Sequence, residues 1–193
     1  MENMDFLYEL DKSLLLQINR QWTTPWMDTF FPAITDLHKS PWFFWIMIPL
    51  FLGLFLWKYK KLGVVLFVGL LLALGSSDLV GNHVFKKNVA RARPGDSLGE
   101  MVIVRSPYGG YSFTSNHAAN MFCLAKYASE FFPQGRIVVY SAAVLISYSR
   151  VYNGVHYPSD VVGGGVLGWI MGWIYSILGK EVFNRLRKRR VNA

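Results

Sequence analysis

Five apolar runs constrain the fold of this chain more than any other feature of its sequence. A helix that crosses a lipid bilayer needs about 20 residues, and most of these runs approach that length. They cover residues 41–57, 62–80, 115–132, 136–150 and 158–178. Only 17% of the residues are charged, below the roughly 25% of soluble domains, and 16% are aromatic. The sequence therefore predicts an all-α integral membrane protein.

The segment that precedes these runs has a different character. Residues 5–20 alternate charged residues with leucine and isoleucine at roughly helical spacing, which favours an amphipathic helix on the membrane surface. Residues 24–38 are more polar and are interrupted by proline, so the sequence leaves open whether they cross the membrane. We predict a bundle of five to six transmembrane helices in a single domain, 1–193, whose residues 1–40 form an interfacial N-terminal segment.

The fifth run carries glycines at four-residue spacing, namely Gly164, Gly168 and Gly172. This small-xxx-small pattern is typical of membrane helices whose backbones approach each other closely. We therefore expect residues 158–178 to pack tightly along a neighbouring helix through these glycines, which need no catalytic role.

A long polar connection, residues 81–114, separates the second apolar run from the third. Loops of this length in compact proteins are usually functional or disordered. Because successive helices cross in alternate directions, this connection meets the start of the third run and the junction of the fourth and fifth runs at one membrane face. Polar residues at such positions are expensive unless they pair or take part in function. We predict that 81–114 is an active-site loop.

Three cations are expected at this face. Lys86 and Arg93 are seven residues apart, which places them within about 20° of each other on a helix that the following proline should end. Arg150 adds the third positive charge. Such a cluster suits a phosphate, which arginine can bind with two parallel hydrogen bonds. Lys87 and Arg91 fall on another face of that helix, and we interpret them as a solvated or headgroup-facing stripe.

The same face also has candidate acid–base groups. His156 precedes a Tyr-Pro pair, and proline favours the first position of a helix, so the fifth helix is expected to begin there. Asp160 then lies in the first turn and can reach the imidazole, which would fix its tautomer and leave the other nitrogen as a nucleophile. His117 begins another helix, from which it could protonate a departing oxygen.

Three groups of residues resemble the signatures of the type 2 phosphatidic acid phosphatases, a superfamily that also contains vanadium haloperoxidases. They read Lys86-x6-Arg93-Pro94, Ser115-Asn116-His117 and Ser149-Arg150-x5-His156-x3-Asp160. The first and third match the family at every defining position. The second usually reads Pro-Ser-Gly-His. Thr114 and Asn116 depart from that pattern. These two departures bear on the shape of the loop and the choice of substrate, but not on the chemistry.

The resemblance implies a role for each matching position. His156 would attack phosphorus and form a phosphohistidine, Asp160 would orient it, and His117 would protonate the leaving group and then activate water. The phosphoryl oxygens would be held by Lys86, Arg93, Ser115, a main-chain amide near Asn116, and Arg150. Such groups can stabilise the transition state without a metal, so no cofactor is expected.

We therefore expect a lipid phosphatase that acts on a membrane lipid phosphate and binds no nucleic acid. The first expected substrate is a polyprenyl pyrophosphate, such as undecaprenyl pyrophosphate, because the chain carries no added soluble domain. Phosphatidylglycerophosphate, phosphatidic acid and the phosphates of lipid A are alternatives. A vanadate-dependent haloperoxidase is disfavoured because those relatives are soluble. A non-catalytic binder or transporter of lipid phosphates is disfavoured because anion binding alone does not need the pair of His156 and Asp160.

Basic residues predict the orientation of the chain in the membrane. Residues 58–61 and 185–190 flank apolar runs on the face opposite the polar clusters. That face holds ten basic residues and the other holds nine, of which three are assigned to phosphate. Because basic residues next to spans mark the cytoplasmic side, we expect a multi-pass protein of the bacterial inner membrane whose site faces the periplasm or exterior.

Overall fold

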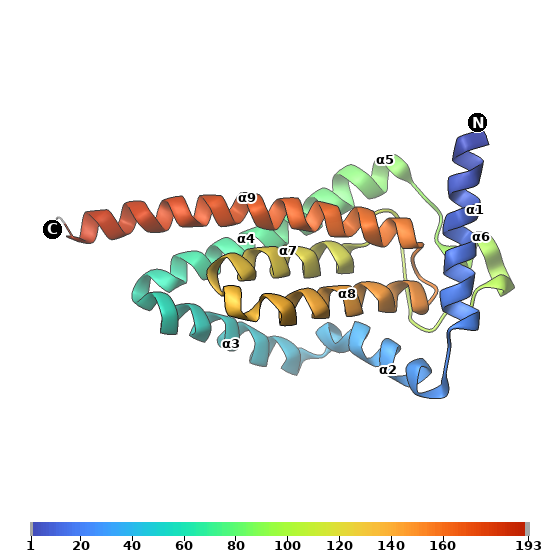
Figure 1. The fold of residues 1–193 in the computed structure, drawn as a ribbon, viewed down its shortest axis with the longest axis horizontal. Coiled ribbons are helices and arrows are strands. Elements are labelled where there is room, and N and C mark those ends of the chain that lie inside the picture. The colour runs from blue at the N-terminus through green and yellow to red at the C-terminus, as the bar shows by residue number, and fades with distance from the viewer. Residues whose placement is uncertain (1, 192–193) are drawn as a thin grey trace.

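The computed structural model describes residues 2–191, which are mostly helical and form no β-strand. Five long helices run side by side, each in the direction opposite to the one before it (Figure 1). They are α3 (Pro41–Tyr59), α4 (Gly63–Val80), α7 (Asn116–Phe131), α8 (Arg136–Tyr152) and α9 (Pro158–Val191). Each corresponds to one apolar run, and the all-α fold class is confirmed.

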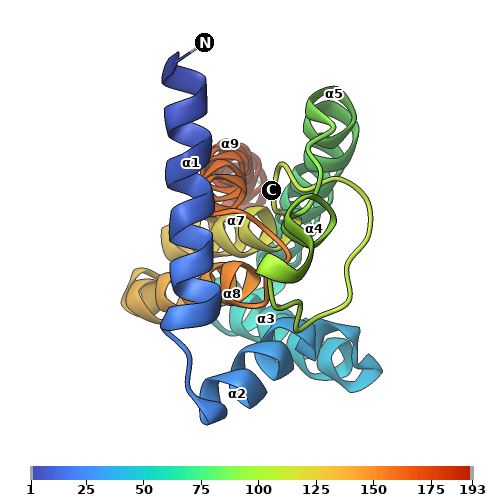
Figure 2. The ribbon, with the colours of Figure 1, turned by 90° about the vertical axis from the view of Figure 1, so that its right-hand side faces the viewer.

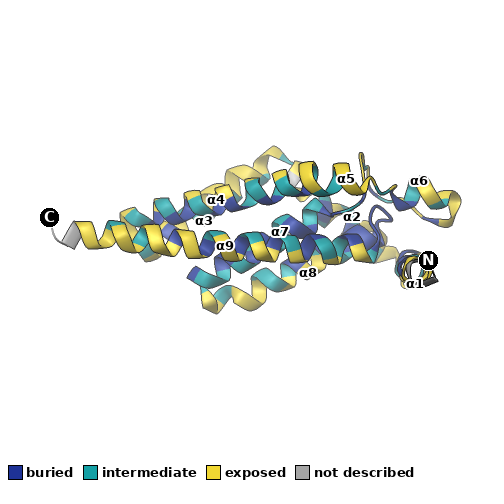
Figure 3. Cartoon of the chain, turned by 90° about the horizontal axis from the view of Figure 1, so that it is seen from above, coloured by how far each residue is buried: buried dark blue, intermediate teal, exposed yellow. Residues whose placement is uncertain are grey.

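The outward faces of the bundle are strongly apolar. Trp45, Trp57 and Ile137 are 78%, 74% and 75% exposed. Figure 3 shows that exposed residues follow the outer sides of α8 and α9, whereas the residues of α7 are buried or intermediate. By length and composition, the stretches Pro41–Met101 and Pro158–Arg189 can cross a membrane. Exposed apolar surface of this extent is expected where lipid surrounds the helices, while the number of five to six crossings stays a prediction.

The glycine pattern brings α9 against α7. A Cβ atom added to Gly168 would overlap the backbone carbonyl of Ala119, and one added to Gly172 would meet the carbonyl of Cys123. Gly164 lies equally close to the carbonyl of Ser115, at the start of α7. The tight packing predicted from the four-residue spacing is therefore confirmed, and it fixes the start of α9 beside the start of α7.

We expect Gly168→Ala to destabilise the protein, because the obstacle is backbone that cannot rotate away. Overpacking of this kind costs about 1–3 kcal/mol, which corresponds to a fall in Tm of roughly 3–10 °C for a chain of this size. Gly75→Ala is the matched control, because an added Cβ there meets nothing within 4 Å. Thermal unfolding in detergent measures the Tm of both variants. An equal Tm for the two variants would contradict the role of Gly168 in packing α9 against α7.

The N-terminal segment lies at the end of the bundle where α7 and α9 begin. α1 (Glu2–Leu16) continues as a π-helical turn, Gln17–Gln21, and lies across the bundle end that faces the viewer in Figure 2. Its Leu15 is buried with Val102, Val151 and Tyr157. The helix expected over residues 5–20 is therefore present, and its place on the membrane surface stays a prediction.

Residues 24–38 also stay at this end. They contain α2 (Pro25–Asp36), which is 12 residues long and therefore too short to cross a bilayer by itself. The ring of Phe31 packs against Tyr148 and Tyr152 of α8, with ring centroids 5.2 Å and 4.7 Å away. α2 thus covers the last turns of α8 before the chain enters α3.

The connection 81–114 is not a loop throughout. Helix α4 continues through a π-helical segment, Gly81–Lys86, into α5 (Lys87–Val89), and two further turns follow, α6 (Pro94–Leu98) and a 3-10 turn at Gly99–Met101. The remaining chain, 102–115, is irregular and returns across the bundle end to α7. The predicted active-site loop is therefore confined mainly to residues 90–93 and 102–115.

The expectation that Lys86 and Arg93 share one face of one helix is wrong. The helix ends at Ala90, which adopts a left-handed conformation with φ 47°, and Arg93 lies in extended chain. Pro94 starts α6 rather than ending the preceding helix, because its fixed φ suits the first helical position. The two cations are brought together by the turn at Ala90 and not by helical periodicity.

Candidate active site

His156 and Asp160 lie buried at the junction of α8 and α9, with exposed fractions of 2% and 0%. Nδ1 of His156 is 3.5 Å from Oδ2 of Asp160. The same Oδ2 accepts the backbone N–H of Tyr157 at 2.8 Å, as an acidic residue in the first turn does in a capping box. The start of α9, predicted from Pro158, therefore brings the carboxylate to the imidazole.

The second ring nitrogen of His156 faces a cation. Nη1 of Arg93 lies 3.2 Å from Nε2 of His156 and donates to the carbonyl of Val155 at 2.8 Å. The guanidinium also donates to the carbonyls of Gly109 and Gly110, both at 2.9 Å. These loop carbonyls hold Arg93 in place, so that a phosphoryl group at Nε2 would lie against its guanidinium.

The other two predicted cations lie nearby. Arg150 is 4% exposed; its Nη1 donates to the hydroxyl of Thr35 at 2.7 Å, while its buried Nε has no hydrogen-bond partner among the described residues. Lys86 is partly buried and within electrostatic range of Arg93 and Arg150. Within residues 2–191, none of these three cations forms an ion pair with a carboxylate. A bound anion would offset the energy of burying such like charges together.

The second signature lies at the first turn of α7. Ser115 is the N-cap residue, and its backbone N–H donates to the carbonyl of Asp160 at 3.1 Å. The hydroxyls of Thr114 and Ser115 are buried and, in the part of the chain that the structure describes, have no hydrogen-bond partner. His117 is the second residue of α7 and is partly buried. Orphan hydroxyls beside a helix N-terminus suit a phosphate, which accepts hydrogen bonds there.

The side chain of Asn116 links the start of α7 to the polar end of α4. Its amide donates to Asp78 in the last turn of α4 at 2.7 Å and to Asn82 in the π-helical segment that follows at 3.0 Å. A contact of phosphate with the main-chain amide near Asn116 stays a prediction. The departure from glycine at this position adds a polar link between α4 and α7.

Comparison with known proteins identifies the family. A family model of the PAP2 superfamily matches residues 62–183, which include all three signatures. The chain belongs to the PAP2 superfamily. It is 29% identical to a lipid A 4'-phosphatase of Bacteroides thetaiotaomicron, over 95% of this chain and 83% of that protein. It is 33% identical to an undecaprenyl-diphosphatase of Sulfolobus acidocaldarius, over 65% of this chain and 59% of that protein.

The fold of this PAP2 protein also matches a solved structure. The crystal structure of a transmembrane PAP2-type phosphatidylglycerolphosphate phosphatase from Bacillus subtilis superimposes with a TM-score of 0.71, at 23% identity, over 91% of this chain and 87% of that one. The resemblance noted in the sequence is therefore confirmed, together with a membrane location and the class of lipid phosphatase. The particular lipid and the roles of individual residues stay proposals.

The electrostatics of the PAP2 site favour a neutral histidine. Burial lowers the pKa of His156 to about 4, the hydrogen bond to Asp160 opposes this shift, and the charges of Arg93 and Arg150 reinforce it. The ring is therefore unprotonated above about pH 5, and this form is lost as the pH falls through 4. A neutral imidazole keeps the lone pair that nucleophilic attack requires.

Residues outside the signatures hold Asp160, and sequence analysis missed them. Arg91 donates from Nη1 to Oδ1 of Asp160 at 2.8 Å, and the hydroxyl of Ser112 donates to Oδ2. The interpretation of Arg91 as a solvated stripe is therefore wrong, whereas Lys87 is exposed as expected. The turn at Ala90 removes Arg91 from the helical face that its position in the sequence implied.

Proposed function

We propose that this PAP2 protein hydrolyses a phosphate or pyrophosphate group of a membrane lipid through a phosphohistidine at His156, without a metal. The observation that carries the proposal is the position of Nε2 of His156, 3.2 Å from Arg93 and within a cluster of cations that no carboxylate neutralises by an ion pair among the described residues. In those residues, no group of three or more His, Cys, Asp or Glu side chains is placed to hold a metal ion.

The reaction proceeds in two displacements. Nε2 of His156 attacks the terminal phosphorus, a P–N bond forms, and the P–O bond to the leaving group breaks while His117 gives its proton to the leaving oxygen. The leaving group is the lipid alkoxide for a monophosphate and the lipid phosphate for a pyrophosphate. His117 then takes a proton from water, the hydroxide attacks phosphorus, and the P–N bond breaks to release inorganic phosphate. Asp160 stabilises the imidazolium charge that develops, and Arg93, Arg150 and Lys86 stabilise the charge on the phosphoryl oxygens.

Similarity to the relatives guides the choice of substrate. We place a phosphate of lipid A first, because the lipid A 4'-phosphatase matches 95% of this chain. A polyprenyl pyrophosphate, the first expectation from the sequence, is the second candidate, because the undecaprenyl-diphosphatase matches 65% of the chain. Both substrates place a phosphate at the height of the site and their acyl or prenyl chains in the bilayer.

The test is phosphate release by purified protein in EDTA. We expect turnover of lipid A in the presence of chelator and its inhibition by vanadate, which adopts the trigonal-bipyramidal geometry of phosphoryl transfer. Undecaprenyl pyrophosphate and phosphatidylglycerophosphate, assayed in parallel, rank the alternatives by kcat/KM. A strict requirement for added Mg²⁺ would contradict the mechanism, since it would show that a metal ion supplies the charge stabilisation.

We propose further that the site faces the periplasm or exterior of a bacterial inner membrane. All site residues lie at the end of the bundle opposite the basic segments 58–61 and 180–190, and basic segments next to spans favour the cytoplasmic side. Single cysteines at Ser97 and Asn192, in a chain with Cys123 replaced by alanine, test this in intact cells. Residue 192 lies outside the described residues, so its use rests on its position in the sequence.

In this labelling experiment we expect an impermeant thiol reagent to modify position 97 and not position 192. Permeabilised cells, in which both positions should react, are the control for accessibility. Labelling of 192 but not 97 in intact cells would reverse the orientation.

A further inference from the structure

We propose that Asp11, on the N-terminal helix, is a positioning residue of the active site that acts by holding Arg91 on the carboxylate of Asp160. The inference rests on the proposed function of His156 and Asp160 and extends it to a segment outside the three signatures. α1 lies across the bundle end where α9 begins, as Figure 2 shows. The N-terminal helix would thus be part of the catalytic apparatus as well as a membrane-surface element.

The guanidinium of Arg91 bridges two carboxylates. Its Nη2 donates to Oδ2 of Asp11 at 2.7 Å and its Nη1 donates to Oδ1 of Asp160 at 2.8 Å. The planar face of Arg91 lies 3.8 Å from the ring centroid of Tyr157. Because the guanidinium is rigid and planar, anchoring one amino group on Asp11 and one face on Tyr157 fixes the direction in which the other amino group points.

Asp11 also binds the start of α9 directly. Its Oδ1 accepts the backbone N–H of Ser159 at 2.8 Å, and its Oδ2 accepts the hydroxyl of Ser159. An N–H in the first turn of a helix has no partner within that helix and is commonly satisfied by a capping side chain. Here the cap comes from a different helix, so α1 and the turn that carries Asp160 are bound together.

The contacts of Arg91 with Asp11 and Asp160 are shielded from solvent. Asp11 is 8% exposed and Asp160 is fully buried. Although burial acts against the charged guanidinium, the two carboxylates raise the pKa of Arg91 above its ordinary value. Without Asp11, Arg91 keeps Asp160 as its carboxylate partner, but its second amino group loses the contact that fixes the orientation of the guanidinium. Arg91 would then no longer be held on Oδ1 of Asp160 in one direction.

The effect on catalysis follows from the orientation of Asp160. With Arg91 on Oδ1, and with Tyr157 and Ser112 on Oδ2, the carboxylate plane is held against Nδ1 of His156. Loss of Arg91 from Oδ1 would let the carboxylate rotate and would increase its basicity. Asp11 touches neither His156 nor the cation cluster, so its removal should change the chemical step rather than the binding of phosphate.

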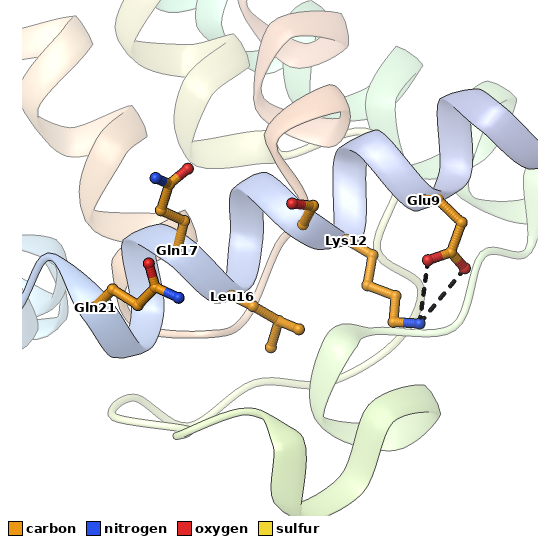
Figure 4. Close-up of a pocket in the computed structure, with 6 residues that line it drawn as sticks. Glu9, Lys12, Leu16, Gln17 and Gln21 are labelled. Carbon is orange, nitrogen blue, oxygen red and sulfur yellow. Dashed lines mark hydrogen bonds and ion pairs between the residues drawn. The ribbon is translucent and has the colours of Figure 1, made fainter.

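α1 also supplies a matched control. Glu9, two residues from Asp11, pairs with Lys12 at a pocket along α1, as Figure 4 shows. The Glu9 side chain is 64% exposed, and its ion pair with Lys12 lies within α1. Glu9→Gln therefore removes the same charge from the same helix without altering Arg91.

The experiment compares Asp11→Ala, Asp11→Glu, Asp11→Asn and Glu9→Gln in the full chain, with kcat, KM and the pH profile of kcat/KM as readouts. We expect Asp11→Ala to lower kcat by about 10- to 100-fold, the size of effect that follows from small misplacement of a catalytic group. KM should stay within about twofold of the wild-type value, because the contacts that bind the substrate in its ground state do not change. The acid limb of the profile should move to higher pH, because a more basic Asp160 raises the pKa of His156.

The other variants separate positioning from folding. Asp11→Asn can still accept the N–H of Ser159 but presents an amide to Arg91, so it should show the kinetic defect with little change in Tm. Asp11→Glu should recover part of kcat, and Glu9→Gln should match the wild type. The double variant Asp11→Ala/Arg91→Ala should lose less kcat than the product of the two single losses, because the two residues share one contact.

Two outcomes would overturn the inference. One is wild-type kcat and pH profile in Asp11→Asn; the other is a loss of kcat in Asp11→Ala that adds fully to that of Arg91→Ala. Either result would leave the proposed function intact as long as His156→Ala is inactive. Activity in His156→Ala would instead contradict the proposed function. The failure of the Asp11 inference and the failure of the proposed function can therefore be distinguished.

Discussion

His156→Ala is expected to abolish phosphate release, with a fall in kcat of at least about 10⁴-fold, as for the removal of other catalytic nucleophiles. The protein should still fold, because His156 lies in the short connection between α8 and α9, outside both helices. The measurement is release of inorganic phosphate at saturating lipid phosphate, with thermal unfolding in detergent to show that the variant is native.

The matched control is His83→Ala. His83 is exposed in the π-helical segment that follows α4 and has no place in the proposed reaction, so its loss should leave kcat close to the wild-type value. Rapid quenching of the wild type with radiolabelled substrate should also trap an acid-labile phosphoenzyme that His156→Ala cannot form. Near-wild-type turnover in His156→Ala would remove the assignment of nucleophile.

Arg150→Met is expected to lower activity and raise stability. The buried guanidinium has one unpartnered nitrogen and no ion-paired carboxylate among the described residues. Replacing such a charge by an apolar chain of similar length relieves a desolvation cost. The Tm should therefore rise by several degrees, while kcat/KM should fall by about 10²- to 10³-fold, the cost of losing one donor to a developing oxyanion.

Arg185→Met is the control for this substitution, because Arg185 is 75% exposed and pairs with Glu181 on the last turns of α9. Arg185→Met should change neither the Tm nor kcat/KM appreciably, since an exposed ion pair of this kind contributes little to stability. Vanadate should raise the Tm of the wild type by binding the folded state, and should do so less in Arg150→Met. A lower Tm for Arg150→Met, with unchanged stabilisation by vanadate, would contradict an anion site at Arg150.

The sequence predicted best those features that depend only on residues close together along the chain. Apolar runs predicted the five bundle helices, because burial in lipid depends on composition along the chain and not on its partners. Pro158 predicted the start of α9, and with it the contact between Asp160 and His156, because both lie within one turn. The glycine spacing predicted that α9 packs closely against another helix, because this pattern lies within α9 itself. It did not predict that the partner helix is α7.

Errors arose where the chain leaves regular structure. Helical periodicity assigned Lys86 and Arg93 to one face, but the left-handed turn at Ala90 ends that periodicity before Arg93. The same turn moved Arg91 from a supposed solvated stripe to the carboxylate of Asp160. A single backbone dihedral of this kind has no reliable signature in the residue types around it, so patterns that assume a continuous helix fail beyond it.

By itself, the sequence determined the class of fold, the family and the groups that carry the chemistry, because apolar runs and signature residues are local properties of the chain. Only the tertiary structure decided which groups surround them. It placed Ser112 on Asp160 and placed Asp11, from the far N-terminus, on Arg91 and Ser159. It also bound the side chain of Asn116 to Asp78 of α4. These contacts join residues that are distant along the chain, and they exist only because the bundle brings α1, the loop and the start of α9 to one end.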